Sequence, residues 1–430
     1  MPRIANDDAR RVRNWISAVF VTFAMLGAGF GVWLGRLPAI RDHLAASTFE
    51  MSVYGLCLAA GSLTGLAFSG RTVTWLGARR SLAVHLPLLT FGMVAAILLF
   101  WAGHIVPAVI ALFIYGFAFS TSDVSANVTA AEAERALGRP RMPLLHAAYS
   151  LGAVTSTGIG SLAEALQIPV PLHTVIAFAL TLATALVALR WVPESEHITA
   201  RLRAAEAPKP LSAITGPIPT IGPGLQPPAP QPERPYNAWT DLRIYLIGTI
   251  ALSMSLGEGT GADWIALALV DGRGYSNSVA TMLVVVFFVA MVATRVVGSA
   301  LLLRFGRVLM IRASAVAYIV GVMLMILGPA MWASVLGAVL WGAGCALAFP
   351  VAVSAAADDP ARAVKSVAAV SAIAYGAYLL GPMLIGFLGE RFGLLPAFWP
   401  LVGFAVLCVV IADAVRRREP QASAAASAER

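Results

Sequence analysis

Twelve apolar runs, each long enough to cross a bilayer, constrain this chain more than any other feature. A transmembrane helix needs roughly 20 apolar residues, and the sequence supplies that length twelve times. The runs lie at 14–37, 49–70, 82–102, 105–131, 143–164, 172–192, 241–266, 277–303, 309–328, 331–353, 365–388 and 394–415. We therefore predict an all-α membrane protein with twelve transmembrane helices in two pseudo-symmetric six-helix halves.

The composition excludes several other classes of protein. Only 12% of the 430 residues are charged, about half the share in soluble globular proteins. The net charge of +8 is carried mostly by loops between the apolar runs, which is how membrane topology is set, so we expect no nucleic-acid partner. The three cysteines lie inside apolar runs and predict no metal site. The sequence has no P-loop, HExxH or GxSxG motif, so we expect neither an enzyme nor a cofactor nor an ATP-driven pump.

The basic residues also predict the orientation of the helices. Of the 30 Lys and Arg residues, four fall on the side opposite the N-terminus, at Arg36, Arg41, Arg273 and Arg391, and Arg295 lies within a run. The other 25 share the side of the N-terminus, so the positive-inside rule places both termini in the cytoplasm. We predict a protein of the inner membrane.

The order of the runs divides the chain into four parts. We assign an N-terminal half to 1–192, a cytoplasmic linker to 193–240, a C-terminal half to 241–415 and a cytoplasmic tail to 416–430. The segment 208–235 has ten prolines in 28 residues, which favours a linker without fixed structure. The alternative is a proline-rich ligand for a partner domain.

The two halves resemble each other in sequence. GRTVTWLGARRSL (Gly70–Leu82) follows the second run, and GSALLLRFGRVLMI (Gly298–Ile311) follows the eighth. Tyr115-Gly116 in the fourth run has a counterpart in Trp341-Gly342 in the tenth. Two parallel six-helix repeats joined by a linker are the architecture of one class of transporter.

The loop after the second run resembles the signature of the major facilitator superfamily. Gly70, Gly77, Arg79 and Arg80 match that signature, whereas Thr74 stands at its acidic position. The resemblance implies a gating or latch role for Arg79 and Arg80, without the acidic partner that the signature supplies.

Within that superfamily, the chain is similar to the bacterial fucose-permease branch. Asp123 and Asn127 match an acidic residue and an asparagine four residues later in that branch, whereas Leu34 replaces an acidic residue in helix 1. The likeness is carried by WLGRLPAIRDHL (Trp33–Leu44), SDVSAN (Ser122–Asn127), GRPRMPLLHAAYSLG (Gly138–Gly152), GEGTGADW (Gly257–Trp264) and GAGCALAFPVAVSAA (Gly342–Ala356).

Asp123 is the sharpest candidate for proton coupling. It lies four residues before Asn127, so both share one face of the fourth helix, and ionisable groups inside a membrane usually face a cavity or a partner. Burial favours the protonated form of a carboxylate, which a proton-coupled carrier needs. The alternative is a structural carboxylate bonded to a neighbouring Ser or Asn.

His146, in the fifth run, is a second candidate for proton coupling, because histidine titrates near neutral pH. The alternative is that it ties helix ends together.

Further polar residues are candidates for the solute path. Glu258, Asp263 and Trp264 lie among Gly257, Gly259 and Gly261, which predict a weakened helix of the kind that lines binding cavities. The alternative is that they cap the seventh helix at the outer surface. We also place Arg36, Asn127 and Tyr375 on the path, with headgroup snorkelling as the alternative for Arg36 and aromatic packing as the alternative for Tyr375 and its neighbour Tyr378.

Arg295 must find an acid or a cavity, because it is a charge in the middle of a helix. A latch and a substrate contact remain open for it. We expect Pro350 and Pro382 to kink the tenth and eleventh helices.

Together these features predict a monomeric secondary transporter that moves a small polar solute, such as a sugar or a polyol. We expect protons as the coupling ion, the lipid bilayer as the surroundings and rocking of the two halves as the mechanism. The alternatives are efflux of drug-like compounds by the same fold and, less favoured, a non-transporting receptor or scaffold.

Overall fold

The computed structural model describes residues 2–137, 141–194, 236–359 and 362–417. Every regular element in these ranges is a helix, with no strand. Most of the predicted linker and tail lies outside the described residues, including the whole proline-rich segment 208–235.

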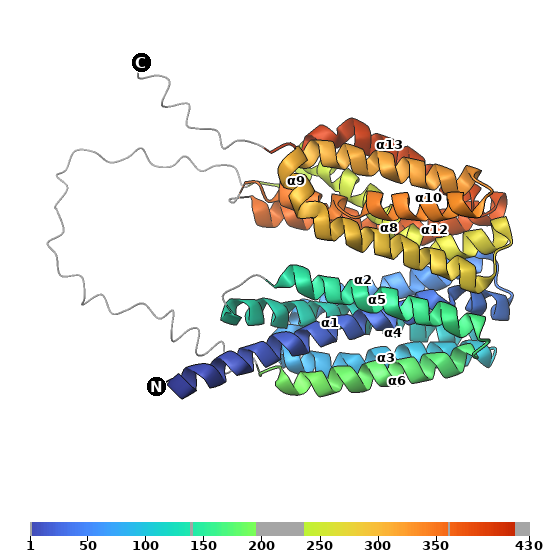
Figure 1. The fold of residues 1–430 in the computed structure, drawn as a ribbon. Helices are drawn as coiled ribbons and strands as arrows, with labels where there is room; N and C mark the ends of the chain where they lie inside the picture. The colour runs from blue at the N-terminus through green and yellow to red at the C-terminus, as the bar shows by residue number, and fades with distance from the viewer. Residues whose placement is uncertain (1, 138–140, 195–235, 360–361, 418–430) are drawn as a thin grey trace, which may run out of the picture.

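The N-terminal half contains six long helices (Figure 1). They are α1 (Pro2–Leu44), α2 (Thr48–Leu76), α3 (Ala78–Trp101), α4 (Ile105–Leu137), α5 (Met142–Ala165) and α6 (Val170–Ala188). Each overlaps one predicted run, and α1 extends furthest beyond its run.

The C-terminal half repeats this plan with differently divided helices. It contains α8 (Leu242–Arg273), α9 (Asn277–Leu327), α10 (Met331–Cys345), α11 (Ala348–Ala356), α12 (Ala363–Phe392) and α13 (Trp399–Ile411). The eighth and ninth runs are joined in α9 across a bend at Gly306, and the tenth run is divided between α10 and α11. The described residues thus form the twelve helical rods that the sequence predicts.

Ten of the twelve rods in the described ranges are long and apolar enough to cross a membrane by composition alone. The two others are α5 and α8. Both have the length of a span, with 24 and 32 residues. They are the most polar rods because α5 is rich in Gly, Ser and Thr, and α8 carries Glu258 and Asp263.

Equivalent glycines make equivalent turns in the two halves. Gly77, between α2 and α3, has φ 76° and ψ 157°, and Gly306, at the bend of α9, has φ 74° and ψ 165°. This backbone region is accessible essentially only to glycine. The internal repeat read from the sequence is therefore present in the backbone.

The packing repeats as well. A side chain on Gly92 of α3 would strike the backbone of Tyr115 in α4, and one on Gly321 of α9 would strike the backbone of Trp341 in α10. The fourth and tenth rods thus pack against the third and ninth in the same way.

The seam between α1 and α5 brings two backbones into contact. A Cβ on Gly31 would lie 2.4 Å from the carbonyl oxygen of Ala153, and one on Gly160 would lie 2.9 Å from the Cα of Gly35. Small residues allow this close approach, which is a main source of helix association in membranes. The seam fixes α5, and with it the polar residues that α5 carries.

The expected weakening of the seventh helix is wrong. α8 runs without a break through Gly257, Gly259 and Gly261. A Cβ on Gly257 would meet the Tyr318 hydroxyl at 2.4 Å, and one on Gly261 would meet the Phe287 ring at 2.6 Å. These glycines make room for aromatic neighbours, and that packing holds the helix together despite their low helix propensity.

The break lies in the tenth helix instead, as Pro350 predicts. α10 ends at Cys345 and α11 starts at Ala348. Proline has no N–H for the carbonyl four residues earlier, so the Ala346 carbonyl loses its donor within the helix. Pro382, in contrast, lies inside the single helix α12.

The two halves approach each other at one end of the bundle and diverge toward the other (Figure 1). The start of α1 and the end of α13 lie at the diverging end. At the end where the halves meet, Arg41 of α1 contacts Asp271 of α8 at 2.6 Å, and Gly386 of α12 packs directly on Ser52 of α2. We call this the closed end.

Candidate functional site

Asp123 and Asn127 lie on α4 and are both half-buried. The Asn127 amide donates to the backbone carbonyl of Asp123 at 2.9 Å and also interacts with the Asp123 carboxylate. The neighbouring Thr121 and Ser122 are fully buried. Asp123 and Asn127 therefore lie on a less tightly packed face of α4 than these two residues do. The structure brings this predicted pair together, and its role stays a prediction.

Tyr149 of α5 lies near charged groups of both halves. It lies within electrostatic range of Asp123 in its own half and of Glu258 and Tyr378 in the other. Its ring meets that of Phe119 edge-on, with centroids 6.4 Å apart.

The sequence does not single out Tyr149, because a tyrosine among apolar residues usually packs. One signal points to it: Tyr149 lies three residues after His146, on the same helical face.

Glu258 and Arg295 form an ion pair that joins α8 to α9. The Arg295 Nη2 atom donates to both carboxylate oxygens of Glu258, at 3.1 and 3.0 Å. Arg295 Nε also donates to the Ala346 carbonyl at 3.2 Å, which is the acceptor released by Pro350. The mid-helix guanidinium thus finds both an acid and the exposed backbone of a broken helix.

The Glu258–Arg295 pair remains accessible. The side chains of Glu258 and Arg295 are 27% and 37% exposed, far more than the apolar core around them. His146 of the opposite half lies within electrostatic range of Arg295. This partly exposed ion pair offers both donor and acceptor groups for hydrogen bonds.

His146 lies on the exposed side of α5. Its ring packs edge-on against Phe23 of α1, with centroids 5.2 Å apart. The described contacts therefore include a packing role beside the electrostatic one, and proton coupling through His146 stays a prediction.

Two tyrosines of α12 face the same region from the C-terminal half. Tyr375 lies within electrostatic range of Asp123, and Tyr378 within range of Glu258, Arg295 and Asp263. Their ring centroids are 6.2 Å apart, and Tyr378 is 42% exposed. Tyr149, Tyr375 and Tyr378 thus have carboxylates of both halves among their electrostatic neighbours, and we call these three residues the tyrosine belt.

Asp263 and Trp264 are placed differently although they are adjacent in sequence. Asp263 is half-buried and makes no hydrogen bond or ion pair within the described part of the chain. Trp264 is 3% exposed and belongs to the hydrophobic core. The structure thus brings Asp263 toward Tyr378 and packs the indole away.

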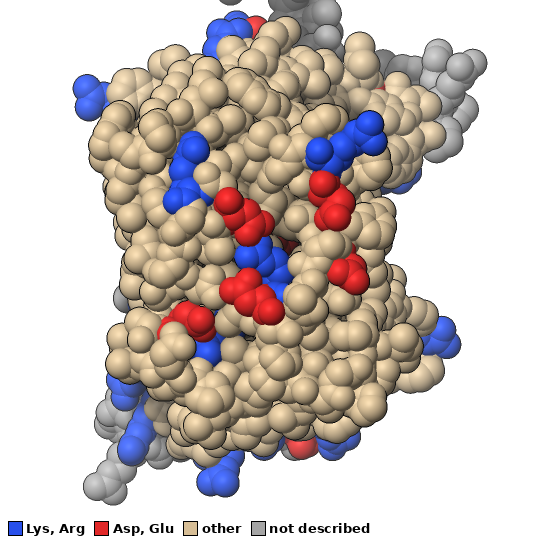
Figure 2. All heavy atoms as spheres, turned by 90° about the vertical axis from the view of Figure 1, so that its right-hand side faces the viewer, with Lys and Arg blue, Asp and Glu red and all other residues tan. Residues whose placement is uncertain are grey.

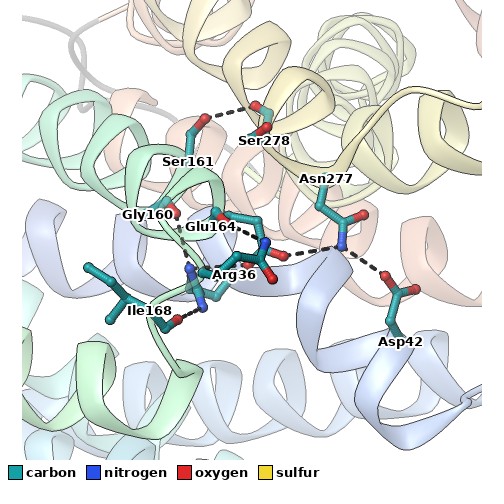
Figure 3. A network of polar contacts seen from close by, with 9 residues as sticks. Arg36, Asp42, Gly160, Ser161, Glu164, Ile168, Asn277 and Ser278 are labelled. Carbon is teal, nitrogen blue, oxygen red and sulfur yellow. Dashed lines mark hydrogen bonds and ion pairs between the residues drawn. The ribbon is translucent and has the colours of Figure 1, made fainter.

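Arg36 is held by protein groups at the closed end (Figure 3). It is 2% exposed, pairs with Glu164 of α5 at 3.1 Å and donates to the carbonyls of Gly160 and Ile168. In this conformation the guanidinium therefore binds the last turns of α5 and the loop that follows it.

The space-filling view of the closed end shows charged side chains gathered near its centre, where the halves meet (Figure 2). The contacts that cross between the halves include Asn277 with Asp42 and Glu164, Ser161 with the Ser278 carbonyl, and the Phe49 N–H with Glu390. These contacts hold the two halves together at the closed end.

Arg79 and Arg80 lie at the diverging end and share one partner. The Glu194 carboxylate lies 3.9 Å from Arg79 and 3.5 Å from Arg80. Glu194 comes three residues after the 3-10 turn Leu189–Trp191 that follows α6, so the basic pair contacts the start of the segment assigned to the linker. The latch role implied for this pair stays a prediction.

Within the described ranges, no three His, Cys, Asp or Glu side chains gather closely enough to hold a metal ion. The polar groups of the central region instead offer carboxylates, a guanidinium and hydroxyls, which suit hydrogen bonds to a polar organic solute.

Comparison with known proteins identifies the family. A model described as Major Facilitator Superfamily matches residues 246–430. The uncharacterized transporter y4wD of Sinorhizobium fredii is 32% identical over 413 residues, which cover 95% of this chain and 100% of that protein.

Solved structures agree on the fold. The nucleoside transporter NupG covers 95% of this chain and 100% of its own, with a TM-score of 0.69 at 15% identity. A D-xylose-proton symporter covers 95% and 98%, with a TM-score of 0.65 at 16% identity. The finer resemblance to the fucose-permease branch stays a prediction, whereas the whole-length relative and the family model lead to one conclusion: the chain belongs to the major facilitator superfamily and is a multi-pass membrane transporter.

Proposed function

We propose that this protein is a proton-coupled secondary transporter that moves a small polar solute, such as a sugar or polyol, through a central site between its two halves. The observation that carries the proposal is the tyrosine belt, with Asp123 on one side and the Glu258–Arg295 pair on the other. Charged groups at this position in an apolar bundle are costly and therefore mark functional pathways.

The chemistry of these groups favours a hydroxyl-rich solute. Carboxylates accept hydrogen bonds from hydroxyls, a guanidinium donates to them, and tyrosine hydroxyls do both. Proteins with the same fold are named as carriers of nucleosides and of D-xylose with protons, and both solutes carry several hydroxyl groups. The likeness supports the solute class and not a particular compound.

Asp123 is our candidate for the proton site. It has no cationic partner among its described contacts, in contrast to Glu258, which is paired with Arg295. A carboxylate without a cation loses less on protonation than one in an ion pair, so Asp123 is the acid better suited to load and release a proton. Asp263 is the second candidate.

For the transport cycle we propose rocking of the two halves. Both termini and the diverging end would face the cytoplasm, and the closed end would face the outside of the inner membrane. The distribution of Lys and Arg supports this orientation. The polar contacts that cross between the halves at the closed end support rocking, because they are partly exposed and able to re-form.

The test is a thermal-unfolding screen of purified protein against sugars, polyols, nucleosides and lipophilic cations. A ligand present at 100 times its Kd stabilises the folded protein by about 2.7 kcal/mol, which is readily measured. We expect a hydroxyl-rich solute to stabilise the protein, and its uptake into proteoliposomes to rise with an imposed proton gradient.

Stabilisation by lipophilic cations alone would instead support drug efflux by this fold. Uptake that ignores the proton gradient would remove proton coupling from the proposal. Deletion of 208–235 separates a transporter from a scaffold, since a transporter should keep its flux.

A further inference from the structure

At the closed end, one neutral side chain of the C-terminal half contacts two carboxylates of the N-terminal half. The Nδ2 atom of Asn277 donates to Asp42 at 2.8 Å and to Glu164 at 3.4 Å (Figure 3). Asp42 lies near the end of α1 and Glu164 near the end of α5, whereas Asn277 is the first residue of α9. One amide thus connects three helices across the boundary between the halves.

The surrounding charges are nearly balanced around this amide. Glu164 is also paired with the buried Arg36 at 3.1 Å. Asp42 shares Arg41 with Asp271 of the other half, at 3.0 and 2.6 Å. Three acids therefore share two arginines, and the remaining need for hydrogen-bond donors is met by Asn277 and by the positive end of the α9 dipole.

The Arg41–Asp271 pair and the Asn277 contacts differ in how much stability their loss would cost. The Arg41–Asp271 pair has an Asp271 side chain that is 42% exposed, and exposed ion pairs are worth little because water replaces them. Asn277 faces Glu164, whose side chain is 18% exposed, so loss of the amide leaves a less hydrated acid without its second donor.

We infer that Asn277 is a clasp that sets the equilibrium between the closed and open states of this end, because a neutral donor is required between Asp42 and Glu164. The inference rests on the alternating-access cycle proposed above. It assigns to Asn277 a role in positioning the two halves, with no contact to the solute. The sign of the charge at residue 277 should therefore control which state is populated.

The decisive variant is Asn277→Asp, which replaces the donor with a third carboxylate of nearly the same size. Like charges that share a site repel, so the variant should open the closed end. An acidic residue in the first turn of a helix is favourable, so α9 should remain folded. We expect the ratio of open to closed molecules to rise at least about tenfold, equivalent to ~1.4 kcal/mol at 25 °C.

Two further variants isolate the cause. Val279→Asp places the same charge on the opposite face of the same helical turn, at a side chain that is 38% exposed, and should leave the equilibrium unchanged. Asp42→Asn combined with Asn277→Asp replaces one of the two facing carboxylates with a donor amide and leaves only Glu164 opposed to the introduced carboxylate, and should therefore restore part of the closed population.

The measurement is the distance between spin labels in nanodiscs, which needs no substrate. The native cysteines are first replaced by alanine, at Cys57, Cys345 and Cys408. One label pair at Leu166 and Trp332 reports on the closed end, and a second pair at Leu76 and Leu303 reports on the diverging end; all four side chains are exposed.

We expect Asn277→Asp to lengthen the first distance and shorten the second, as rocking requires. An unchanged first distance, widening at both ends, an equal effect of Val279→Asp, or a double variant as open as Asn277→Asp would each overturn the inference. None of these results would bear on solute binding or proton coupling, which are tested separately by the unfolding screen and flux measurements.

Discussion

The seam between α1 and α5 makes a quantitative prediction about two glycines on one helix. A Cβ on Gly27 would lie 1.9 Å from the carbonyl oxygen of Tyr149, whereas a Cβ on Gly29 would lie 3.4 Å from the nearest atom, in the Phe178 ring. Carbon and oxygen atoms normally approach to about 3.3 Å. Gly27→Ala must therefore separate the two backbones by more than 1 Å, and Gly29→Ala fits with little or no movement.

The expected cost follows from the geometry. Overpacking typically destabilises by about 1–3 kcal/mol, while replacing glycine by alanine within a helix gains about 0.5–1 kcal/mol. Gly27→Ala should be less stable than wild type, and Gly29→Ala equal or more stable. The gap between the two variants should be at least about 1 kcal/mol, and a domain of 150–250 residues shifts by about 2–4 °C per kcal/mol.

The assay is thermal unfolding of the two variants side by side in the same detergent. Size-exclusion chromatography or tryptophan fluorescence measures the fraction that remains folded at each temperature. Equal unfolding temperatures for Gly27→Ala and Gly29→Ala would refute the proposed backbone contact between α1 and α5.

The remaining predictions concern the central pair, the tyrosine belt and the topology. Glu258→Ala should destabilise the protein by about 1–2 kcal/mol, between the values for exposed and buried ion pairs, and adding Arg295→Met should recover part of the loss; an unaltered unfolding temperature for the single variant would contradict this. Tyr378→Phe should weaken the stabilisation by a bound solute, while Tyr318→Phe, which removes a buried hydroxyl that has no hydrogen-bond partner among the described residues, should not; equal effects would contradict a role for the belt. Reporter fusions at Gly216 and at the C-terminus should both read cytoplasmic, and a periplasmic signal from either would overturn the topology.

Much of the architecture could be predicted because membranes impose simple rules on sequence. A span needs a fixed length of apolar residues, so the twelve runs identify the rods. The turn glycines Gly77 and Gly306 reveal the repeat because few other residues adopt their backbone conformation. Pro350 marks the broken helix for a similarly local reason.

The continuity of α8 could not be predicted from local propensity. Gly257 and Gly261 weaken an isolated helix, but here they admit Tyr318 and Phe287, which are 61 and 26 residues away in the sequence. Tertiary packing therefore decides the conformation, and a single sequence does not show which aromatic residue fills each space.

The contacts between the halves also could not be predicted from the sequence. Asn277 lies 235 residues from Asp42 and 113 from Glu164, and nothing local distinguishes it from an ordinary residue at a helix start. The partner of Arg295 was open for the same reason. Residue types indicated that Asp123, Glu258 and Arg295 matter. Only the fold shows that Glu258 forms an ion pair with Arg295, whereas Asp123 has no cationic partner among the described residues.

This difference between the two acids leads to the most direct test of proton coupling. Asp123→Asn mimics the protonated carboxylate with almost no change in volume and keeps a partner for Asn127. In proteoliposomes, with a hydroxyl-rich solute identified by the unfolding screen, we expect this variant to exchange labelled solute across the membrane at a rate close to that of wild type. It should fail to accumulate the solute when a proton gradient is imposed. Full gradient-driven accumulation by Asp123→Asn would contradict the assignment of the proton to Asp123.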